Sequence, residues 1–277
     1  MSEKLSDHAY NRYSQFGEDG IIEQIFKQIP PRTRLCVEFG AWDGFHLSNT
    51  AHLWTNSWRA VLIEGDPYRF GSLVRRTRGY DTVCVNAFVS RDGPNSLEAI
   101  LSRYGVNETI DLLSIDIDGD DYHIVASLTT LRPRVLICEH NPTIPGESDL
   151  FGNYGDHFGC SAGALVRVAG EKGYRLVAMT ETNCFFVLNE EFPAFVQYET
   201  RLEKLKIDKH LVYLLVSNTG DYVLSRPCSY PLSFPYRGGL NGAHHRVRFK
   251  PVFLRPFLSI VSRVRSFLRR AYERHLK

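Results

Sequence analysis

Apolar and polar positions along the chain form two alternating kinds of segment. Short apolar runs rich in β-branched residues occur at 34–40, 59–66, 81–89, 110–118 and 134–141, and most of them end in a polar or glycine residue. Continuous apolar runs of this length are typical of strands buried on both faces of a parallel sheet. Segments with helical spacing lie before and between them, at 18–28, 48–57, 67–78, 96–104 and 121–131. The pattern predicts an α/β fold, Rossmann-like and doubly wound, with a mostly parallel sheet.

The second half of the chain continues this pattern with one change of strand direction. Residues 142–160 carry Pro and Gly and predict a loop, and 161–179 predict a helix, a turn at Gly173 and a strand. Residues 183–189 follow so closely that they should pair antiparallel with that strand at the sheet edge. We also expect a helix at 194–206 and a hairpin around 217–221. We place a single domain at 1–240, including a lead-in at 1–33, and a separate tail at 241–277.

Composition places the chain among ordinary globular proteins. Of its 277 residues, 43% are hydrophobic and 23% are charged, which fits one sizeable buried core. The first residues lack the features of a secretory signal, and no apolar run reaches the roughly 18 residues of a membrane-spanning helix. The six cysteines are scattered without a CxxC pair, which favours buried thiols over zinc ligands or disulfides. We therefore expect a cytoplasmic protein.

Charge is distributed unevenly along the chain. Residues 246–277 hold ten Lys or Arg and one acid, which leaves 23 basic and 30 acidic residues elsewhere. Within 253–277, apolar residues recur at helical spacing with arginines between them, as in basic amphipathic helices that bind an anionic membrane surface. Packing against a partner or against the chain's own domain is the alternative. Nucleic acid is disfavoured because no recognisable nucleic-acid-binding module accompanies the tail. We expect peripheral attachment at the inner face of a membrane.

Polar residues gather where the predicted strands end. In open parallel sheets, ligands bind outside the carboxyl ends of the strands, near the point where the strand order reverses. The positions selected by this rule are 38–44, 64–66, Asn86, 116–121 and 139–141. The most acidic of them is LLSIDIDGDDYH (112–123), with aspartates at 116, 118, 120 and 121.

A glycine turn follows the first predicted strand. In VEFGAWDGF, Gly40 and Gly44 would let the backbone bend tightly and approach a ligand closely. The motifs G-x-G-x-x-G and G-x-x-x-x-G-K-[ST] are absent, which weighs against NAD and ATP. Glu64 ends the second strand, where an acid can accept both ribose hydroxyls of an adenosine. The combination favours a nucleoside cofactor without phosphates, such as S-adenosylmethionine. A solvated strand end is the plain alternative for Glu64.

The segments VEFGAWDGFHLSN, VLIEGDP and LLSIDIDGDDYHIV, with the upstream YSQFGEDGIIEQIF, resemble class I S-adenosylmethionine-dependent methyltransferases. The resemblance is strongest to the FkbM-type branch, whose members are similar to O-methyltransferases of sugars and natural products, and it covers roughly residues 13–188. It implies that Glu38 and Gly40 line the methionine end of the cofactor, Glu64 its ribose and Asn86 the neighbourhood of its adenine. It also implies that Gln15 reaches in from the lead-in. The predicted cofactor-binding set is Gln15, Glu38, Gly40, Gly44, Glu64, Asn86 and Asp116.

The aspartate-rich stretch admits two chemical interpretations besides a polar turn. An EF-hand is excluded, because its sixth and twelfth positions would be Asp121 and Ser127 instead of Gly and Glu. In the first interpretation, Asp116, Glu139 and Asn141 hold Mg²⁺ or Mn²⁺ with hard oxygen ligands, which resembles the catechol-type methyltransferases. Such an ion would lower the pKa of an acceptor hydroxyl.

In the second interpretation, no metal takes part. His140 or His123 acts as the general base that removes the hydroxyl proton, and Asp118 orients the acceptor. Asp118 departs from the resembled family, which has Glu there, so its role is not carried over directly. The plain alternative for each histidine is a hydrogen-bonded scaffold residue, and Asp120 and Asp121 suit a helix N-terminus.

These features predict an enzyme, an S-adenosylmethionine-dependent methyltransferase acting on a hydroxyl of a sugar or glycan close to a membrane. The acceptor class rests on the resemblance and on the basic tail. One alternative is an N-methyltransferase that modifies a small molecule or a protein. The other is a non-catalytic adaptor that keeps the fold and recruits a partner through the tail. Nothing in the pattern specifies the oligomeric state.

Overall fold

The structure is a computed structural model that describes residues 2–117, 119–216, 218 and 222–225. The chain divides into two compact units, Met1–Leu211 and Val212–Lys277, which we describe separately. The predicted boundary at residue 240 and the tail at 241–277 lie outside the described residues.

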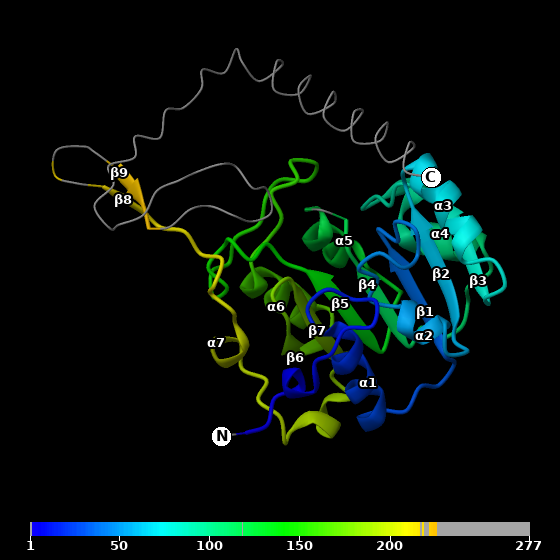
Figure 1. The fold of residues 1–277 in the computed structure, drawn as a ribbon, viewed down its shortest axis with the longest axis horizontal. Coiled ribbons are helices and arrows are strands. Elements are labelled where there is room, and N and C mark those ends of the chain that lie inside the picture. Colours follow the sequence, from blue (N-terminus) through cyan, green and yellow to red (C-terminus); the bar gives the residue numbers. More distant parts are fainter. Residues whose placement is uncertain (1, 118, 217, 219–221, 226–277) are drawn as a thin grey trace, which may run out of the picture. The chain divides into compact units, whose positions relative to one another are not determined.

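A seven-stranded sheet forms the centre of the first unit, in the order β3-β2-β1-β4-β5-β7-β6 (Figure 1). Its strands are β1 (Leu35–Phe39), β2 (Arg59–Glu64), β3 (Thr82–Asn86), β4 (Leu112–Ile115), β5 (Val135–Glu139), β6 (Tyr174–Met179) and β7 (Asn183–Leu188). Strands β1 to β5 pair in parallel, whereas β7 runs antiparallel to both β5 and β6. The doubly wound, mostly parallel sheet is confirmed. The antiparallel strand lies one place inside the edge, between β5 and β6.

Helices precede or connect most of the strands. The α-helices are α1 (Glu18–Gln28), α2 (Ala51–Trp54), α3 (Pro67–Arg76), α4 (Leu97–Arg103), α5 (Asp121–Ser127), α6 (Ala162–Glu171) and α7 (Leu202–Leu205), and the 3₁₀ turns are η1 (Leu5–His8), η2 (Gly93–Asn95) and η3 (Phe192–Phe195). The predicted helix at 18–28 has the observed bounds. The one predicted at 194–206 is instead split into η3 and α7. The one predicted at 121–131 stops at Ser127, because the backbone N–H groups of 129–131 are bound by Glu98.

Alternating side chains of each strand build two cores, one on each face of the sheet. On one face, Val37, Leu113 and Leu136 pack with residues of α4, α5 and α6. On the other face, Leu62 and Ile137 pack with residues of α1, α2 and α3. The buried cysteines Cys36, Cys138, Cys160 and Cys184 are unbridged and burial raises the pKa of their thiols, as expected for packing residues. The three-layer arrangement follows directly from the two-sided burial of the strands.

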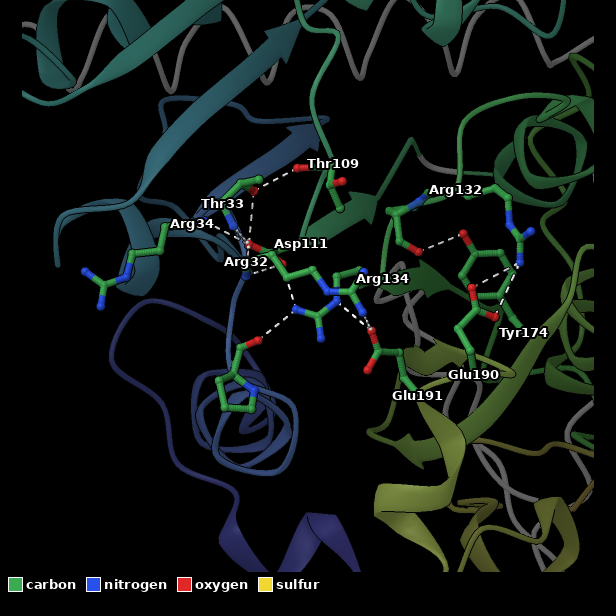
Figure 2. A network of polar contacts seen from close by, with 12 residues as sticks. Arg32, Thr33, Arg34, Thr109, Asp111, Arg132, Arg134, Tyr174, Glu190 and Glu191 are labelled. Atoms are coloured by element: carbon green, nitrogen blue, oxygen red, sulfur yellow. Dashed lines mark hydrogen bonds and ion pairs between the residues drawn. The ribbon is translucent and has the colours of Figure 1, made fainter.

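An ion cluster fastens the amino ends of the strands (Figure 2). The fully buried Asp111, just before β4, accepts the backbone N–H groups of 32–34 at 2.8–3.0 Å and the Arg134 guanidinium at 2.9 Å. Arg134 also donates to Glu191, which follows β7, at 2.7 Å. Burial opposes ionisation of Asp111, but these donors outweigh it and lower its pKa. The cluster joins the starts of β1, β4 and β5 to the end of β7.

The second unit contains an antiparallel pair, β8 (Leu214–Val216) and β9 (Tyr222–Leu224), with Val216 opposite Tyr222. This pair confirms the hairpin predicted around 217–221. The proposed membrane-binding segment 253–277 lies outside the part of the chain that the structure describes. Among the helices it does describe, none has both the length and the apolar character needed to cross a bilayer.

Candidate functional site

The predicted strand-end residues line up along one edge of the sheet. Glu64 pairs in register with Asn86, and Phe39 pairs with both Ile63 and Ile115. Gly40 therefore stands level with Glu64 on one side and with Asp116 on the other. Ile115 pairs with Cys138, so Glu139 follows at the level of Asp116. The strand order reverses at β1, between β2 and β4, which is where doubly wound folds bind ligands.

The glycine turn after β1 is attached to the end of β2 through Glu64. One carboxylate oxygen of this buried acid accepts the Trp42 N–H at 2.8 Å, and the other accepts the Asp66 N–H at 2.7 Å. Gly40 has a φ of 78°, and a Cβ at this position would overlap the carbonyl oxygen of Asp116. Only glycine permits this approach without moving the backbone. Each oxygen of Glu64 keeps a second lone pair, which a ribose hydroxyl could use.

Glu38 lies two residues before Gly40, within β1, and its side chain binds the next part of the loop. Its carboxylate accepts the Ser48 and Thr50 hydroxyls at 2.6 and 2.7 Å and the Asn49 N–H at 2.8 Å. Burial raises the pKa of Glu38, and the negative charge of Asp19 raises it further. The structure thus gives Glu38 a positioning role in the loop, and its predicted contact with the methionine end stays a prediction.

Aromatic side chains flank Glu64 and Asn86. The exposed Trp42 carries the Arg69 guanidinium 3.5 Å from its ring centroid, and the exposed Phe88 packs against Gly65. The Asn86 amide donates to the Glu64 carbonyl at 2.7 Å. A planar ligand beside Asn86 would therefore meet exposed ring surfaces, which suits an adenine.

The lead-in crosses the same edge and carries Gln15. Glu18, at the start of α1, accepts the Gln15 N–H at 3.1 Å, and it also accepts the Thr180 hydroxyl and the Asn183 amide at 2.7 and 3.1 Å. Thr180 follows β6 and Asn183 starts β7, so this contact fixes the lead-in at the carboxyl edge. Further along, the Tyr13 ring lies 5.6 Å from that of Phe45 in the glycine turn. The exposed Gln15 is placed between these two attachments.

The acidic stretch after β4 serves partly to start helix α5. Asp121 is buried and accepts the N–H groups of Ile117 and Gly119 at 3.3 and 3.1 Å, while Asp120 accepts the Gly155 N–H at 2.8 Å. These two acids act as helix-start and loop-fastening residues, which supports the plain alternative. Asp118, the predicted orienting acid, lies outside the described residues. Asp116 and Glu139 are half-buried at the edge.

The metal hypothesis finds little support in the surroundings of Asn141. Its Oδ1 accepts the Thr143 N–H and hydroxyl at 2.9 and 2.6 Å, and its Nδ2 donates to the Phe158 carbonyl at 2.9 Å. An amide held in this way orders the following loop and does not present its oxygen to an ion beside Asp116 and Glu139. Within the described ranges, no three His, Cys, Asp or Glu side chains are placed to hold a metal ion.

The two candidate bases have different surroundings. The Nε2 of His123 lies 2.9 Å from the Gly152 carbonyl oxygen, which can only accept, so Nε2 carries the proton and the neutral ring has its lone pair on Nδ1. His140 is only 4% exposed, and neither of its ring nitrogens has a hydrogen-bond partner among the described residues. Burial lowers the pKa of His140 to about 4. Of these two candidates, His123 is the more accessible to solvent.

Sequence reasoning missed the aromatic residues around this edge. Trp42 lies inside the quoted glycine turn, and an aromatic residue between two turn glycines was the available signal. The loop after β5 holds Leu150, Phe151, Tyr154 and Phe158 exposed. Four large apolar residues within nine positions of a Gly-rich loop could have been noticed from the sequence.

Comparison with known proteins gives structural likeness only. No protein-family profile and no curated protein sequence matches the chain. Cofactor-bound Rv0187 from MTB has 16% identity and a TM-score of 0.43, over 66% of this chain and 86% of that chain. A S-adenosylmethionine-dependent methyltransferase from Clostridium acetobutylicum has 9% identity and a TM-score of 0.42, over 62% and 90%.

A third similar structure is the Pyrococcus abyssi tRNA (uracil-54, C5)-methyltransferase in complex with S-adenosyl-L-homocysteine. It has 11% identity and a TM-score of 0.36, and the match covers 60% of this chain but only 36% of that chain. Because these TM-scores lie below 0.5, we base the function on the residues of this chain.

Proposed function

We propose that the protein is an S-adenosylmethionine-dependent methyltransferase of the class I type that methylates a hydroxyl of a sugar or glycan. The observation that carries the proposal is the hydrogen bond from the Trp42 N–H of the glycine turn to Glu64, at the point where the strand order reverses. An acid at the end of β2, a close-packed glycine at the end of β1 and no phosphate-binding loop together fit an adenosine that carries no phosphate.

The chain's own residues fit such a cofactor. Glu64 would bind the ribose hydroxyls with the lone pairs that Trp42 and Asp66 leave, and Asn86 with Phe88 would border the adenine. Gly40 would let the cofactor approach the backbone. When bound, S-adenosylmethionine would supply an electrophilic methyl group.

Catalysis would then require alignment of the acceptor and removal of one proton. The acceptor would lie beyond the ends of β4 and β5, beside Asp116 and Glu139. We assign His123 as the base, since its Nε2–H is committed to Gly152 and Nδ1 can take the hydroxyl proton. An orienting role for Asp118 and peripheral membrane attachment through residues 253–277 are retained as parts of the proposal.

Isothermal titration calorimetry with S-adenosylmethionine tests the proposal. The wild-type protein should bind, and Glu64→Ala should weaken binding at least tenfold, because the ribose acceptor is lost. Glu203→Ala, which removes an exposed acid in α7, is the matched control and should leave affinity unchanged. Absence of binding to the wild type, or equal affinity in Glu64→Ala, would reject the cofactor assignment.

The transfer step is tested separately by release of S-adenosylhomocysteine in the presence of neutral glycosides. His123→Asn should lower kcat by about 10²–10⁴ while leaving the affinity for S-adenosylmethionine unchanged. Co-sedimentation with anionic liposomes, with and without residues 253–277, tests the membrane part. Equal sedimentation of both forms would remove the tail from the proposal.

A further inference from the structure

The loop between β5 and α6 exposes several large apolar side chains next to the candidate site. We use the term aromatic loop for residues 150–158. Four large apolar side chains of this loop are open to solvent: Leu150 (52%), Phe151 (43%), Tyr154 (39%) and Phe158 (52%). Large apolar groups gathered on one exposed loop mark a binding surface more often than isolated ones do.

The aromatic loop is firmly shaped by its own hydrogen bonds. Asp156 accepts the N–H groups of Asn153 and Phe158 at 2.8 and 2.9 Å, and the Gly152 N–H donates to the Gly159 carbonyl at 2.9 Å. Phe151 pairs with Cys160 in an antiparallel bridge. The backbone that carries the exposed rings is therefore ordered before any ligand arrives, which reduces the entropy lost on binding.

The aromatic loop is also attached to the ends of the two strands beside the proposed acceptor position. Gly155 donates to Asp120 at 2.8 Å and Gly152 accepts from His123, so the loop contacts the segment after β4. Phe158 accepts from Asn141 at 2.9 Å, which ties it to the segment after β5. The Phe158 backbone thus lies next to the end of the strand that carries Glu139.

Charge around the loop selects the kind of ligand. Residues 141–160 contain three acids, Glu147, Asp149 and Asp156, and no Lys or Arg. The neighbouring stretch 116–121 adds four aspartates. Surfaces that stack nucleic-acid bases combine rings with a basic groove, and surfaces that bind anionic lipid are also basic. This acidic surrounding disfavours both.

The cations that do reach the rings are already paired. Arg167 lies over the Tyr122 and Phe151 rings and bonds to Asp149 at 2.9 Å, and Arg91 lies over Tyr154 and bonds to Asp92 at 3.2 Å. Guanidinium groups over these rings oppose the approach of a second cation. The acids disfavour an anionic ligand and the paired guanidinium groups disfavour a cation over Phe151 and Tyr154, so an uncharged ligand with an apolar face fits this surface best.

We propose that the aromatic loop is the acceptor-binding platform, with Phe158 stacking on the C–H face of a neutral sugar ring beside the ends of β4 and β5. Sugar binding by this loop does not require the methyl donor. Only the methylation of the bound sugar rests on the proposed function. Phe158 is the central residue because its ring is open and its backbone is fixed to Asn141.

Saturation-transfer NMR on the full chain tests the platform with uncharged methyl glycosides of glucose, galactose, mannose and rhamnose as probes. At least one glycoside should receive saturation from the wild type, strongest at the C–H protons of one ring face. Phe158→Ala should reduce the signal at least fivefold, and Phe158→Trp should keep it. Tyr104→Ala, an exposed aromatic residue at the C-terminal end of α4, is the matched control and should change nothing.

Absence of signal from every glycoside, or an equal signal in Phe158→Ala, would overturn the platform, as would Phe158-dependent binding of choline or of a uridine oligonucleotide without glycoside binding. Tyr154→Ala provides a second variant should Phe158→Ala unfold. Calorimetry with S-adenosylmethionine on the same samples separates the two proposals. Phe158-dependent glycoside binding without cofactor binding would support the platform and reject the methyltransferase proposal. Cofactor binding without glycoside binding would support the methyltransferase proposal and reject the platform.

Discussion

Gly40 and Asp116 meet backbone to backbone where β1 and β4 end, so closely that a Cβ on Gly40 would overlap the Asp116 carbonyl oxygen. This contact places the end of β1 against the acid-rich stretch after β4, next to the turn whose Trp42 N–H is bound by Glu64. It also makes position 40 the most restricted glycine of the candidate site, because φ at 78° already disfavours a side chain.

Gly40→Ala should therefore destabilise the protein by about 3 kcal/mol or more, through backbone strain and the steric overlap together. Gly79→Ala is the control, because Gly79 has a φ of 95° and open space around its Cβ position. It should cost only the strain, about 1–2 kcal/mol. Urea unfolding of both variants measures the difference, and equal free energies of unfolding would contradict the contact.

A second glycine holds the aromatic loop in place. Gly119 has a φ of 126°, and a Cβ there would lie 2.7 Å from the backbone of His157. Gly119→Ala should push the loop outward and increase amide hydrogen exchange at 150–158, without speeding exchange in β1 or β2. Gly105→Ala, with φ at 73° and no atom near its Cβ position, should leave exchange in the loop unchanged. Protection retained in Gly119→Ala would show that the loop tolerates the displacement.

Because His140 is buried, the free energy of unfolding should depend on pH in the mildly acidic range. The folded-state pKa is about 4, below the ordinary 6.5, so between these values the unfolded state binds a proton that the folded state does not. The free energy of unfolding should therefore fall as pH drops from 6.5 towards 4, by up to about 3 kcal/mol. His140→Leu should remove this part of the slope, whereas His46→Leu, at an exposed site, should keep it. An NMR titration midpoint for His140 near 6.5 would contradict the prediction.

Breaking the ion cluster at the amino edge of the sheet should lower the free energy of unfolding and leave the affinity for S-adenosylmethionine unchanged. Asp111→Asn leaves Arg134 buried with one acid partner fewer, and should lower the free energy of unfolding by about 3–5 kcal/mol. The lowered pKa of Asp111 means that its contribution is present above the unfolded value near 3.8 and disappears as pH falls through the folded value.

The control for the ion cluster is Lys27→Met, which breaks an exposed pair with Glu23 on helix α1 and should cost less than about 1 kcal/mol. Affinity for S-adenosylmethionine should be the same in both variants under folding conditions. A tenfold loss of affinity in Asp111→Asn would show that the two edges of the sheet are coupled.

Local signals in the sequence were sufficient for the strands of the sheet, for helices such as α1 and α3, and for the edge that carries the candidate site. Helix α3 was predictable because Asp66 caps its first N–H groups and Pro67 occupies its first position. The alignment of Glu64, Gly40 and Asp116 followed from the rule that parallel strands bring their carboxyl ends together.

Contacts between residues far apart in the chain could not be predicted from such local signals. Asp111 meets Arg134 and the backbone of 32–34 only after three strands have paired. The burial of His140 depends on β7 lying beside β5, and no local pattern shows how completely a strand end is covered. The use of Asn141 within its own loop likewise depends on Phe158, which is 17 residues away.

The ion cluster around Asp111 and the proposed binding surface occupy opposite edges of the same sheet. Substitutions that change acceptor specificity at residues such as Phe158 would thus leave the contacts of the Asp111 ion cluster intact. Such an arrangement lets selection, natural or in the laboratory, explore new substrates with little risk of unfolding. Libraries for altered specificity should accordingly be drawn from residues 150–158, with positions 32–34, 111 and 134 held constant.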